Sequence, residues 1–293
     1  MAFNNQNLRY RLAMLNTAEK LIVINVAVFI INNLLVFLFG LSTDYFSRFF
    51  ELPTNLISFL YQPWSIITYS FFHAGFLHIF FNMIWLYFAS RIFLTLFDGK
   101  RFLNVYFLGV IAGGLLFLIA YNLFPVFLGV ESSIIGASAG VMAILIYICT
   151  YIPNQEVLLF FFRLKLWYIG VFYVILDLIQ IPSDNAGGHI AHLGGAAIGF
   201  IYARQSLQGK DFGAWFGNLA DAIVNFFKGI KKSPLKTVHK TRKYEKASYS
   251  KSNNNSAAAH QKKIDEILDK ISKSGYESLS KAEKDFLFKA GKD

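Results

Sequence analysis

One serine, two histidines and one asparagine lie inside strongly apolar stretches of this sequence and could together do chemistry. Ser138 lies in the string Gly136-Ala137-Ser138-Ala139-Gly140, which opens an apolar run that continues to about Ile152. A helix over this run would rise about 26 Å, which is less than the roughly 30 Å hydrocarbon core of a bilayer. Ser138 is therefore expected below the membrane surface, where a hydroxyl serves either for packing or as a nucleophile.

The other three residues lie in two further apolar stretches. His78 and Asn82 are four residues apart, so a helix would carry them on one face, and His192 lies near the start of the last stretch. Each residue alone has a structural explanation, because small-residue strings pack membrane helices and single polar side chains bond neighbouring helices. Four such residues at one depth would favour a functional site, since burying an unpaired polar group costs free energy.

The composition predicts an all-α polytopic membrane protein. Of 293 residues, 55% are hydrophobic and only 16% are charged, whereas soluble domains average about 25% charged residues. We predict six membrane-spanning helices, at about residues 21–40, 71–97, 102–123, 136–152, 166–181 and 188–203. Residues 41–65 mix aromatic side chains with charges and prolines, which favours an interfacial or half-embedded loop.

Charge in the connections predicts the orientation. Lys and Arg gather after the second and fourth spans and in the tail, while the other connections carry mainly Asp and Glu. The positive-inside bias therefore places both termini in the cytoplasm. Spans two, four and six then enter from the outer side, which brings His78, Asn82, Ser138 and His192 to similar depth.

The remainder of the chain divides around the membrane domain. We expect a cytoplasmic N-terminal segment (1–20), the six-helix domain (21–205), an amphipathic juxtamembrane segment (206–232), a flexible basic linker (233–260) and a small C-terminal helical hairpin (261–293). Of 28 Lys and Arg residues, 9 precede Arg204 and 19 lie at or beyond it. This distribution is typical of a cytoplasmic tail beside an anionic leaflet and argues against nucleic-acid binding.

The hairpin has its own sequence signals. Ile264, Ile267, Leu268 and Ile271 have helical spacing, and Ser280 with Glu283 forms a capping box before a second helix. The segment is too short for a core of its own, so we expect it to dock on a partner that the sequence does not identify.

Glycine spacing predicts which membrane helices approach closely. Gly136 and Gly140 form one small-xxx-small pair, and Gly195 and Gly199 form another on the face that carries His192. If spans four and six pack by these faces, Ser138 and His192 come within reach, and an imidazole there would take the hydroxyl proton during attack.

Four motifs in the apolar stretches resemble those of a known family, the rhomboid intramembrane serine proteases. The matching motifs are His73-Ala-Gly-Phe-Leu-His78-Ile-Phe-Phe-Asn82, Ala112-Gly-Gly114, Gly136-Ala-Ser138 and Ala191-His192-Leu-Gly-Gly195, and the resemblance covers about residues 20–205. A bacterial member of this family would lie in the cell's inner membrane with multiple passes.

The resemblance implies a role for each matching residue. Ser138 would be the nucleophile and His192 the general base, a dyad without a carboxylate and without a cofactor. Asn82, His78 and the backbone N–H of Ser138 would stabilise the oxyanion. His73 would be structural, and Gly136 would support the site.

Three positions depart from the family's pattern. Ser65 follows Trp64 where the family often has an arginine, Met142 stands where a tyrosine often packs on the catalytic histidine, and Ala139 replaces a glycine. The resemblance implies an intramembrane serine endopeptidase that cleaves transmembrane segments of other proteins in the lipid bilayer. The alternative is a proteolytically inactive relative that binds membrane clients. A transporter would show paired repeats, which we do not find.

His73, His189 and Asp177 are further polar residues within or beside the apolar stretches. His73, His78, His189 and His192 could in principle hold a metal, but no HExxH string accompanies them and we expect none. His189 is expected near the interface. Asp177, near the outer end of the fifth span, would face a water-filled cavity or pair with a neighbour, and we do not assign it to catalysis.

Overall fold

The computed structural model describes residues 10, 12–159, 161–183, 185–227 and 254–290. It divides into two compact units, the first of residues 1–231 and the second of residues 232–293. The α-helices of the first unit are α2 (Thr17–Phe39), α3 (Leu56–Tyr61), α4 (Ser65–Thr68), α5 (Phe76–Leu96), α6 (Gly99–Leu123), α7 (Ser138–Tyr151), α8 (Leu166–Gln180), α9 (Ala186–Leu207) and α10 (Ala214–Phe227). Its short 3-10 turns are η1 (Ser47–Phe49), η2 (Tyr69–Phe71) and η3 (Pro125–Phe127).

Strands are few among the described residues and form two antiparallel pairs. β1 (Leu52–Pro53) pairs with β2 (Ser133–Ile134), and β3 (Glu156–Leu159) pairs with β4 (Phe162–Lys165). The second pair is a hairpin between α7 and α8 that carries the basic residues expected in that connection.

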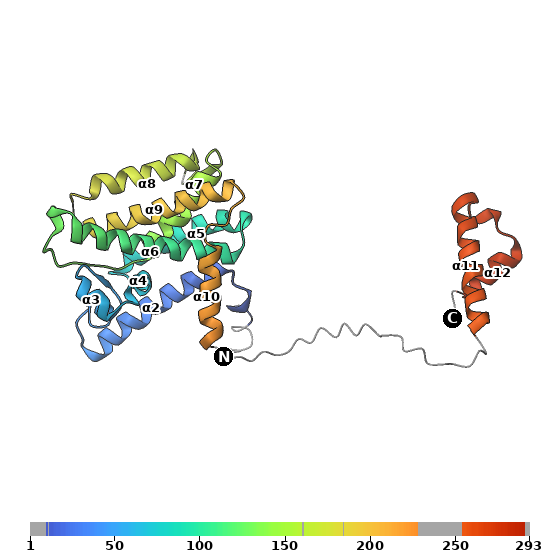
Figure 1. Ribbon diagram of the computed structural model, residues 1–293, viewed down its shortest axis with the longest axis horizontal. Helices are drawn as coiled ribbons and strands as arrows, with labels where there is room; N and C mark the ends of the chain where they lie inside the picture. Colours follow the sequence, from blue (N-terminus) through green and yellow to red (C-terminus); the bar gives the residue numbers. More distant parts are fainter. Residues whose placement is uncertain (1–9, 11, 160, 184, 228–253, 291–293) are drawn as a thin grey trace. The chain divides into compact units, whose positions relative to one another are not determined.

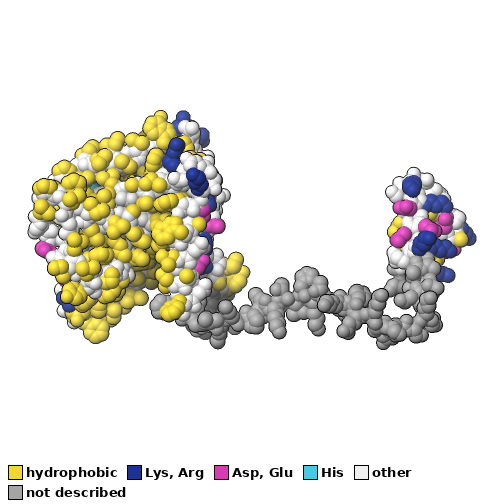
Figure 2. Space-filling model, in the orientation of Figure 1, with side chains coloured by type: hydrophobic (Ala, Val, Ile, Leu, Met, Phe, Trp, Pro, Cys, Tyr) yellow, Lys and Arg dark blue, Asp and Glu magenta, His cyan; other side chains and the backbone are white. Residues whose placement is uncertain are grey.

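The first unit has the surface of a membrane protein. Three helices, α2, α5 and α6, are long and apolar enough to cross a membrane, and α7 and α8 are shorter apolar helices. Figure 2 shows hydrophobic side chains over most of the visible face of this unit. The protein is thus a multi-pass membrane protein. α9 coincides with the sixth predicted span, and its glycines and histidines make it less apolar than the others.

Helix ends differ from the prediction where capping decides them. α2 begins at Thr17 rather than at residue 21, because Asn16 accepts a hydrogen bond from the Glu19 amide (2.9 Å) and the Glu19 carboxylate accepts one from the Asn16 amide (2.9 Å). The last four residues of the expected N-terminal segment are therefore helical. α5 begins at Phe76 rather than at residue 71, since the preceding residues form η2 and an extended stretch ending at Gly75.

α7 is the centre of the first unit. Eleven of its 14 residues, Ala139 to Cys149, are buried, and α5, α6, α8 and α9 all pack against it. Burial on every side of an apolar helix means that protein rather than lipid surrounds it. In Figure 1, α6, α9 and α8 run side by side around this helix. Ser138, its first residue, is therefore held by the most enclosed element of the unit.

α9 approaches α7 through glycines, as the spacing predicted. A side chain at Gly195 would collide with the backbone oxygen of Ala139, and one at Gly199 with that of Ala143. The prediction that Gly140 faces α9 is wrong, because a side chain there would meet Tyr106 of α6 instead. The small residues of α7 that receive α9 are Ala139 and Ala143, one helical turn apart.

The loop at residues 41–65 is ordered by hydrogen bonds to its own backbone. The Trp64 indole N–H donates to the Phe49 carbonyl (2.8 Å), the Gln62 amide donates to the Glu51 carbonyl (3.2 Å), and the Thr68 hydroxyl donates to the Phe50 carbonyl (3.1 Å). Ser65, where the family often has an arginine, is fully buried. The loop is thus anchored without that cation.

Two ion pairs link the start of α6 to α10 and to the turn before it. Lys100 contacts Asp221 at 2.6 Å, and Arg101 contacts Asp211 at 3.3 Å. Trp215, Leu219 and Ile223 of α10 stay at least half exposed. An apolar face beside basic residues is the composition expected of a helix that lies on a membrane surface.

The second unit is a helical hairpin of α11 (Asn254–Ser274), the turn η4 (Tyr276–Ser278) and α12 (Lys281–Ala290). α11 begins at Asn254, seven residues before the expected start of the hairpin at residue 261, because Ala257 to Ala259 favour a helix. The capping box is present, with the Glu283 carboxylate accepting from both the amide (2.7 Å) and the hydroxyl (2.8 Å) of Ser280. Ile267 is buried, whereas Leu268 is half exposed.

Adding a side chain at the α7–α9 contact is predicted to destabilise the first unit. Gly199→Val places two methyl groups against the Ala143 backbone, and such overpacking costs about 1–3 kcal/mol. We expect a lower thermal unfolding midpoint of the purified protein in detergent. Gly75→Ala is the control, because nothing lies within 4 Å of a side chain there and its backbone is extended. Equal midpoints for the two variants would contradict the packing.

The second unit is predicted to loosen in acid through Glu283. The Lys270 ammonium, bonded at 2.9 and 3.0 Å, and the Ser280 cap lower the pKa of this carboxyl from 4.5 to about 2. Because the pKa is lower in the folded state, ionised Glu283 stabilises the fold at a pH above the unfolded pKa. This contribution to stability is lost as the pH falls from about 4.5 towards 2. Amide hydrogen exchange in α11 and α12, corrected for intrinsic rates, should therefore accelerate over this range. Glu283→Gln should remove that acid dependence, and its persistence would contradict this assignment.

Candidate active site

Ser138 lies at the start of α7 directly after a backbone bend that only glycine adopts easily. Gly136 has φ +126°, and its amide donates to the Tyr69 carbonyl (2.9 Å). A side chain at Gly136 would lie 2.7 Å from Nε2 of His78 and 3.7 Å from Oγ of Ser138. Gly136 therefore permits both the bend and the approach of His78 to the serine.

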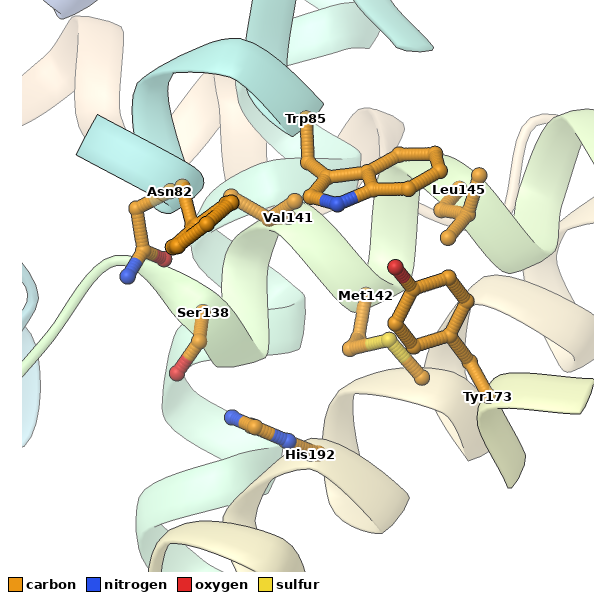
Figure 3. Close-up of a pocket in the computed structure, with 9 residues that line it drawn as sticks. Asn82, Trp85, Ser138, Val141, Met142, Leu145, Tyr173 and His192 are labelled. Atoms are coloured by element: carbon orange, nitrogen blue, oxygen red, sulfur yellow. The ribbon is translucent and has the colours of Figure 1, made fainter. Parts of the chain in front are cut away.

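Ser138 and His192 line the same cavity and face each other. The cavity, of about 250 Å³, is lined by Phe81, Asn82, Trp85, Ser138, Val141, Met142, Leu145, Tyr173 and His192. Figure 3 shows the Ser138 hydroxyl and the His192 ring directed towards one another from α7 and α9. No hydrogen bond joins them among the described residues, and substrate-free sites often have long contacts that tighten on binding. The His192 side chain is 23% exposed, so the cavity is not sealed within the protein.

Asn82 reaches the cavity from α5 with a free donor. One N–H of its amide donates to the His78 carbonyl (2.9 Å), which fixes the side chain. The amide group carries two N–H bonds, so a second one is left for a ligand. In Figure 3 this side chain lies beside Ser138.

His78 and His73 lie beside the segment that leads into Ser138. Nδ1 of His78 accepts from the Ala74 amide (3.3 Å), so the ring proton of neutral His78 is assigned to Nε2, the atom next to Gly136. Nε2 of His73 accepts from the Ala137 amide (3.4 Å). His78 therefore places a donor beside Gly136 but is not among the residues that line the cavity, whereas His73 holds the backbone that precedes the serine.

The start of α7 also offers backbone donors. The first turn of a helix has N–H groups without partners inside the helix, and the first residue of α7 is Ser138. These groups carry the positive end of the helix dipole, which favours a developing negative charge. The backbone N–H groups at this end of α7 are therefore further candidate donors beside Ser138.

Aromatic residues that the sequence did not single out complete the cavity. Trp85 of α5 and Tyr173 of α8 meet edge to face with ring centres 5.0 Å apart. Met142 lines the cavity one turn after Ser138. Helical spacing placed Met142 there, but nothing in the sequence indicates that α8 would supply Tyr173.

Asp177 has a closer relation to the site than expected. Its Oδ1 lies 2.8 Å from Nδ1 of His192 and 2.8 Å from Nδ1 of His189. Of the two expectations for this residue, pairing with a neighbour is the one confirmed. His189 belongs to the same cluster, and its side chain is only 13% exposed.

The metal-capable group found among the described residues differs from the one considered from the sequence. It consists of Asp177, His189 and His192, whose ligand atoms lie within 4.8 Å of one another. His73 and His78 are not part of it. Their rings contact each other edge to face at 5.1 Å, beside the start of α7.

Comparison with known proteins places this arrangement in a family. A family profile described as the Rhomboid domain matches residues 60–208, just over half of the chain. The chain belongs to the rhomboid family. The matched region of this rhomboid holds α5 to α9 and with them Asn82, Ser138 and His192.

Two further matches are more limited. RHOMBOID-like protein 12, mitochondrial, of Arabidopsis thaliana is 30% identical over 158 residues, which are 50% of this chain and 47% of the relative. The chain thus aligns with about half the length of that protein. Residues 251–289 match a family of unknown function (DUF6576), which coincides with the hairpin of α11 and α12.

A side chain at Gly136 is predicted to disable the site of this rhomboid. Gly136→Ala forces a strained φ, which costs about 1–3 kcal/mol, and displaces the His78 ring from the serine. We expect slower labelling of Ser138 by a fluorophosphonate probe. Gly129→Ala is the control, since Gly129 also has positive φ (79°) but open space around it. Equally fast labelling of both variants would show that the approach of His78 is irrelevant.

Proposed function

We propose that this rhomboid is an intramembrane serine endopeptidase that cleaves transmembrane segments of other membrane proteins. The observation that supports it most is that Ser138 and His192, 54 positions apart in the sequence, face each other in one cavity within an apolar bundle. A hydroxyl and an imidazole so placed are the parts of a nucleophile and its general base.

We further propose six membrane-spanning helices, with α9 as the sixth and both termini in the cytoplasm of a bacterial inner membrane. The bias of Lys and Arg towards alternate connections supports this orientation. The cavity would then open to the outer side, from which water reaches it.

In the first step, Ser138 would attack the carbonyl carbon of the scissile peptide bond. Its Oγ–H proton passes to Nε2 of His192 as the Oγ–C bond forms, and the carbonyl π electrons move to the oxygen. The products of this step are a tetrahedral oxyanion and an imidazolium. The backbone N–H of Ser138, the second amide N–H of Asn82 and Nε2–H of His78 are the donors that would stabilise the oxyanion.

In the second step, the C–N bond breaks and the imidazolium gives its proton to the leaving amine. A water molecule then attacks the acyl group on Ser138, gives one proton to His192, and the serine oxygen leaves as a hydroxyl when that proton returns to it. Each proton that His192 takes is returned, so no cofactor is required.

The substrate segment would have to unwind locally before cleavage. A continuous membrane helix keeps its carbonyls in hydrogen bonds, so small or helix-destabilising residues are expected near the cut. The cavity is lined mainly by apolar side chains, including Trp85, Met142 and Tyr173, and would accept an uncharged substrate side chain.

The dyad is tested by cleavage of a model transmembrane substrate in proteoliposomes. Ser138→Ala and His192→Ala should each lower the rate by at least about 10³-fold, because residues that act as a unit fail together. Ser90→Ala is a matched control, since Ser90 is a buried serine of α5 bonded to its own helix at the Tyr87 carbonyl (3.0 Å). His260→Ala, in the second unit, controls for loss of an imidazole.

The alternative function gives a different result. A silent relative that binds membrane clients would show no cleavage by the wild-type protein and no fluorophosphonate label on Ser138, while still retaining the substrate segment in pull-down from detergent. Unchanged melting points for all variants are required before either outcome is interpreted.

A further inference from the structure

A buried carboxylate connects α8 to the imidazole of the proposed base. Asp177 is 4% exposed, and its Oδ1 is 2.8 Å from Nδ1 of His192. The same oxygen is 2.8 Å from Nδ1 of His189, one helical turn away on α9. Oδ2 is buried and has no hydrogen-bond partner within the described ranges. The whole contact therefore passes through one oxygen.

This contact determines which nitrogen of His192 carries the proton. An ionised carboxylate can only accept hydrogen bonds, so the neutral imidazole must donate through Nδ1–H. The lone pair is then on Nε2, the nitrogen available to take a proton from the serine. With the opposite tautomer, Nε2 would already carry a proton and Ser138 would face no base.

We propose that Asp177 is a positioning residue that completes a Ser138–His192–Asp177 triad. This inference rests on the proposed protease function and corrects the expectation of a dyad without a carboxylate. Asp177 holds the His192 ring in its productive tautomer and, when Ser138 gives up its proton, faces the resulting imidazolium with a negative charge. The proton stays on His192, and Asp177 itself takes none.

Asp177 fixes the His192 ring more firmly than the cavity side chain Met142 can. Met142 is a flexible thioether with no aromatic face, so it orients a ring beside it only weakly. The hydrogen bond to α8 fixes His192 at Nδ1. His189, edge-on to His192 at 5.8 Å, donates to the same oxygen and fixes the carboxylate in turn.

A metal ion is a poorer explanation of the same cluster. Tetrahedral ligands at about 2.0–2.1 Å from zinc lie roughly 3.3 Å from each other, whereas both oxygen–nitrogen distances here are 2.8 Å. Those distances are typical of hydrogen bonds. A metal on Nδ1 would also place the ring proton on Nε2, which removes the base.

The test compares Asp177→Asn, which keeps an acceptor but removes the charge, with Asp177→Leu, which removes both. Leucine suits a membrane helix, so this variant is expected to fold. Labelling of Ser138 by the fluorophosphonate should slow by about a hundredfold or more for both variants, because leucine removes the acceptor for Nδ1–H and the asparagine amide can donate to Nδ1 and hold the unproductive tautomer. Asp221→Asn, an exposed aspartate of α10, is the matched control and should label at the wild-type rate.

A second readout separates positioning from support of the fold. The chain has only six histidines, so ¹⁵N-histidine NMR of the full-length protein, assigned with His192→Ala, can report the tautomer of His192. Asp177→Leu should shift His192 away from the Nδ1–H form while the thermal midpoint stays close to that of the wild type. His189→Gln should slow labelling less than Asp177→Asn, because the bond to His192 remains.

The outcomes are distinguishable from failure of the proposed function. If wild type labels and Ser138→Ala does not, but both Asp177 variants label at the wild-type rate, the triad is rejected while the protease stands. A larger loss for His189→Gln than for Asp177→Asn would also reject it. Labelling that rises with EDTA and falls with added zinc would assign the cluster to a metal instead. If wild type does not label at all, the proposed function itself fails.

Discussion

The contact of α9 with α7 at backbone distance is the constraint on which the rest of the first unit depends. Gly195 and Gly199 lie against the backbone oxygens of Ala139 and Ala143, so these two helices cannot be moved apart or rotated without losing the closest packing in the unit. Between helices in lipid, such packing replaces the hydrophobic driving force that acts in water. The contact begins at Ala139, next to Ser138, and at Gly195, about one turn after His192, and so the glycines set how far apart the two side chains are.

The polar side chains near this contact have specific hydrogen-bond partners. His73 accepts from the backbone before the serine, His78 accepts from the Ala74 amide, and Asn82 donates to its own helix. Oδ1 of Asp177 lies 2.8 Å from two imidazoles of a different helix. His78 and Asn82 each use one hydrogen-bonding group within their own segment and keep an N–H for another partner, which is how polar residues in an apolar bundle can be both stable and reactive.

The sequence predicted those parts of the protein that depend on local patterns. Apolar runs located the helices, since the requirement for internal hydrogen bonding in lipid leaves few alternatives. The spacing of His78, Asn82, Ser138 and His192 predicted similar depth, because depth follows from helical rise and orientation. Asn82, Ser138 and His192 line one cavity, whereas His78 lies beside Gly136 and is not among the lining residues. Helix starts were predicted less well: the capping box of Asn16 and the break at Gly75 outweigh hydrophobicity over a few residues. The Asp177 pairing could not be derived, because it depends on how α8 is rotated about its own axis. An apolar helix with a single charge does not reveal that angle.

The segment before Ser138 is joined to earlier parts of the chain at three points. Ile134 of β2 pairs with Leu52, the Thr54 amide donates to the Ser132 carbonyl (2.9 Å), and the Gly136 amide donates to Tyr69. Residues on the N-terminal side of α5 therefore shape the serine loop, whereas His192 and Asp177 come from the last two helices of the bundle. During synthesis from the N-terminus, a growing chain acquires the serine loop and its supports first and the imidazole last. A chain interrupted before α9 has neither the imidazole that faces Ser138 nor the glycines that pack against α7, so under the proposed mechanism newly made, incomplete molecules would not attack their neighbours in the membrane.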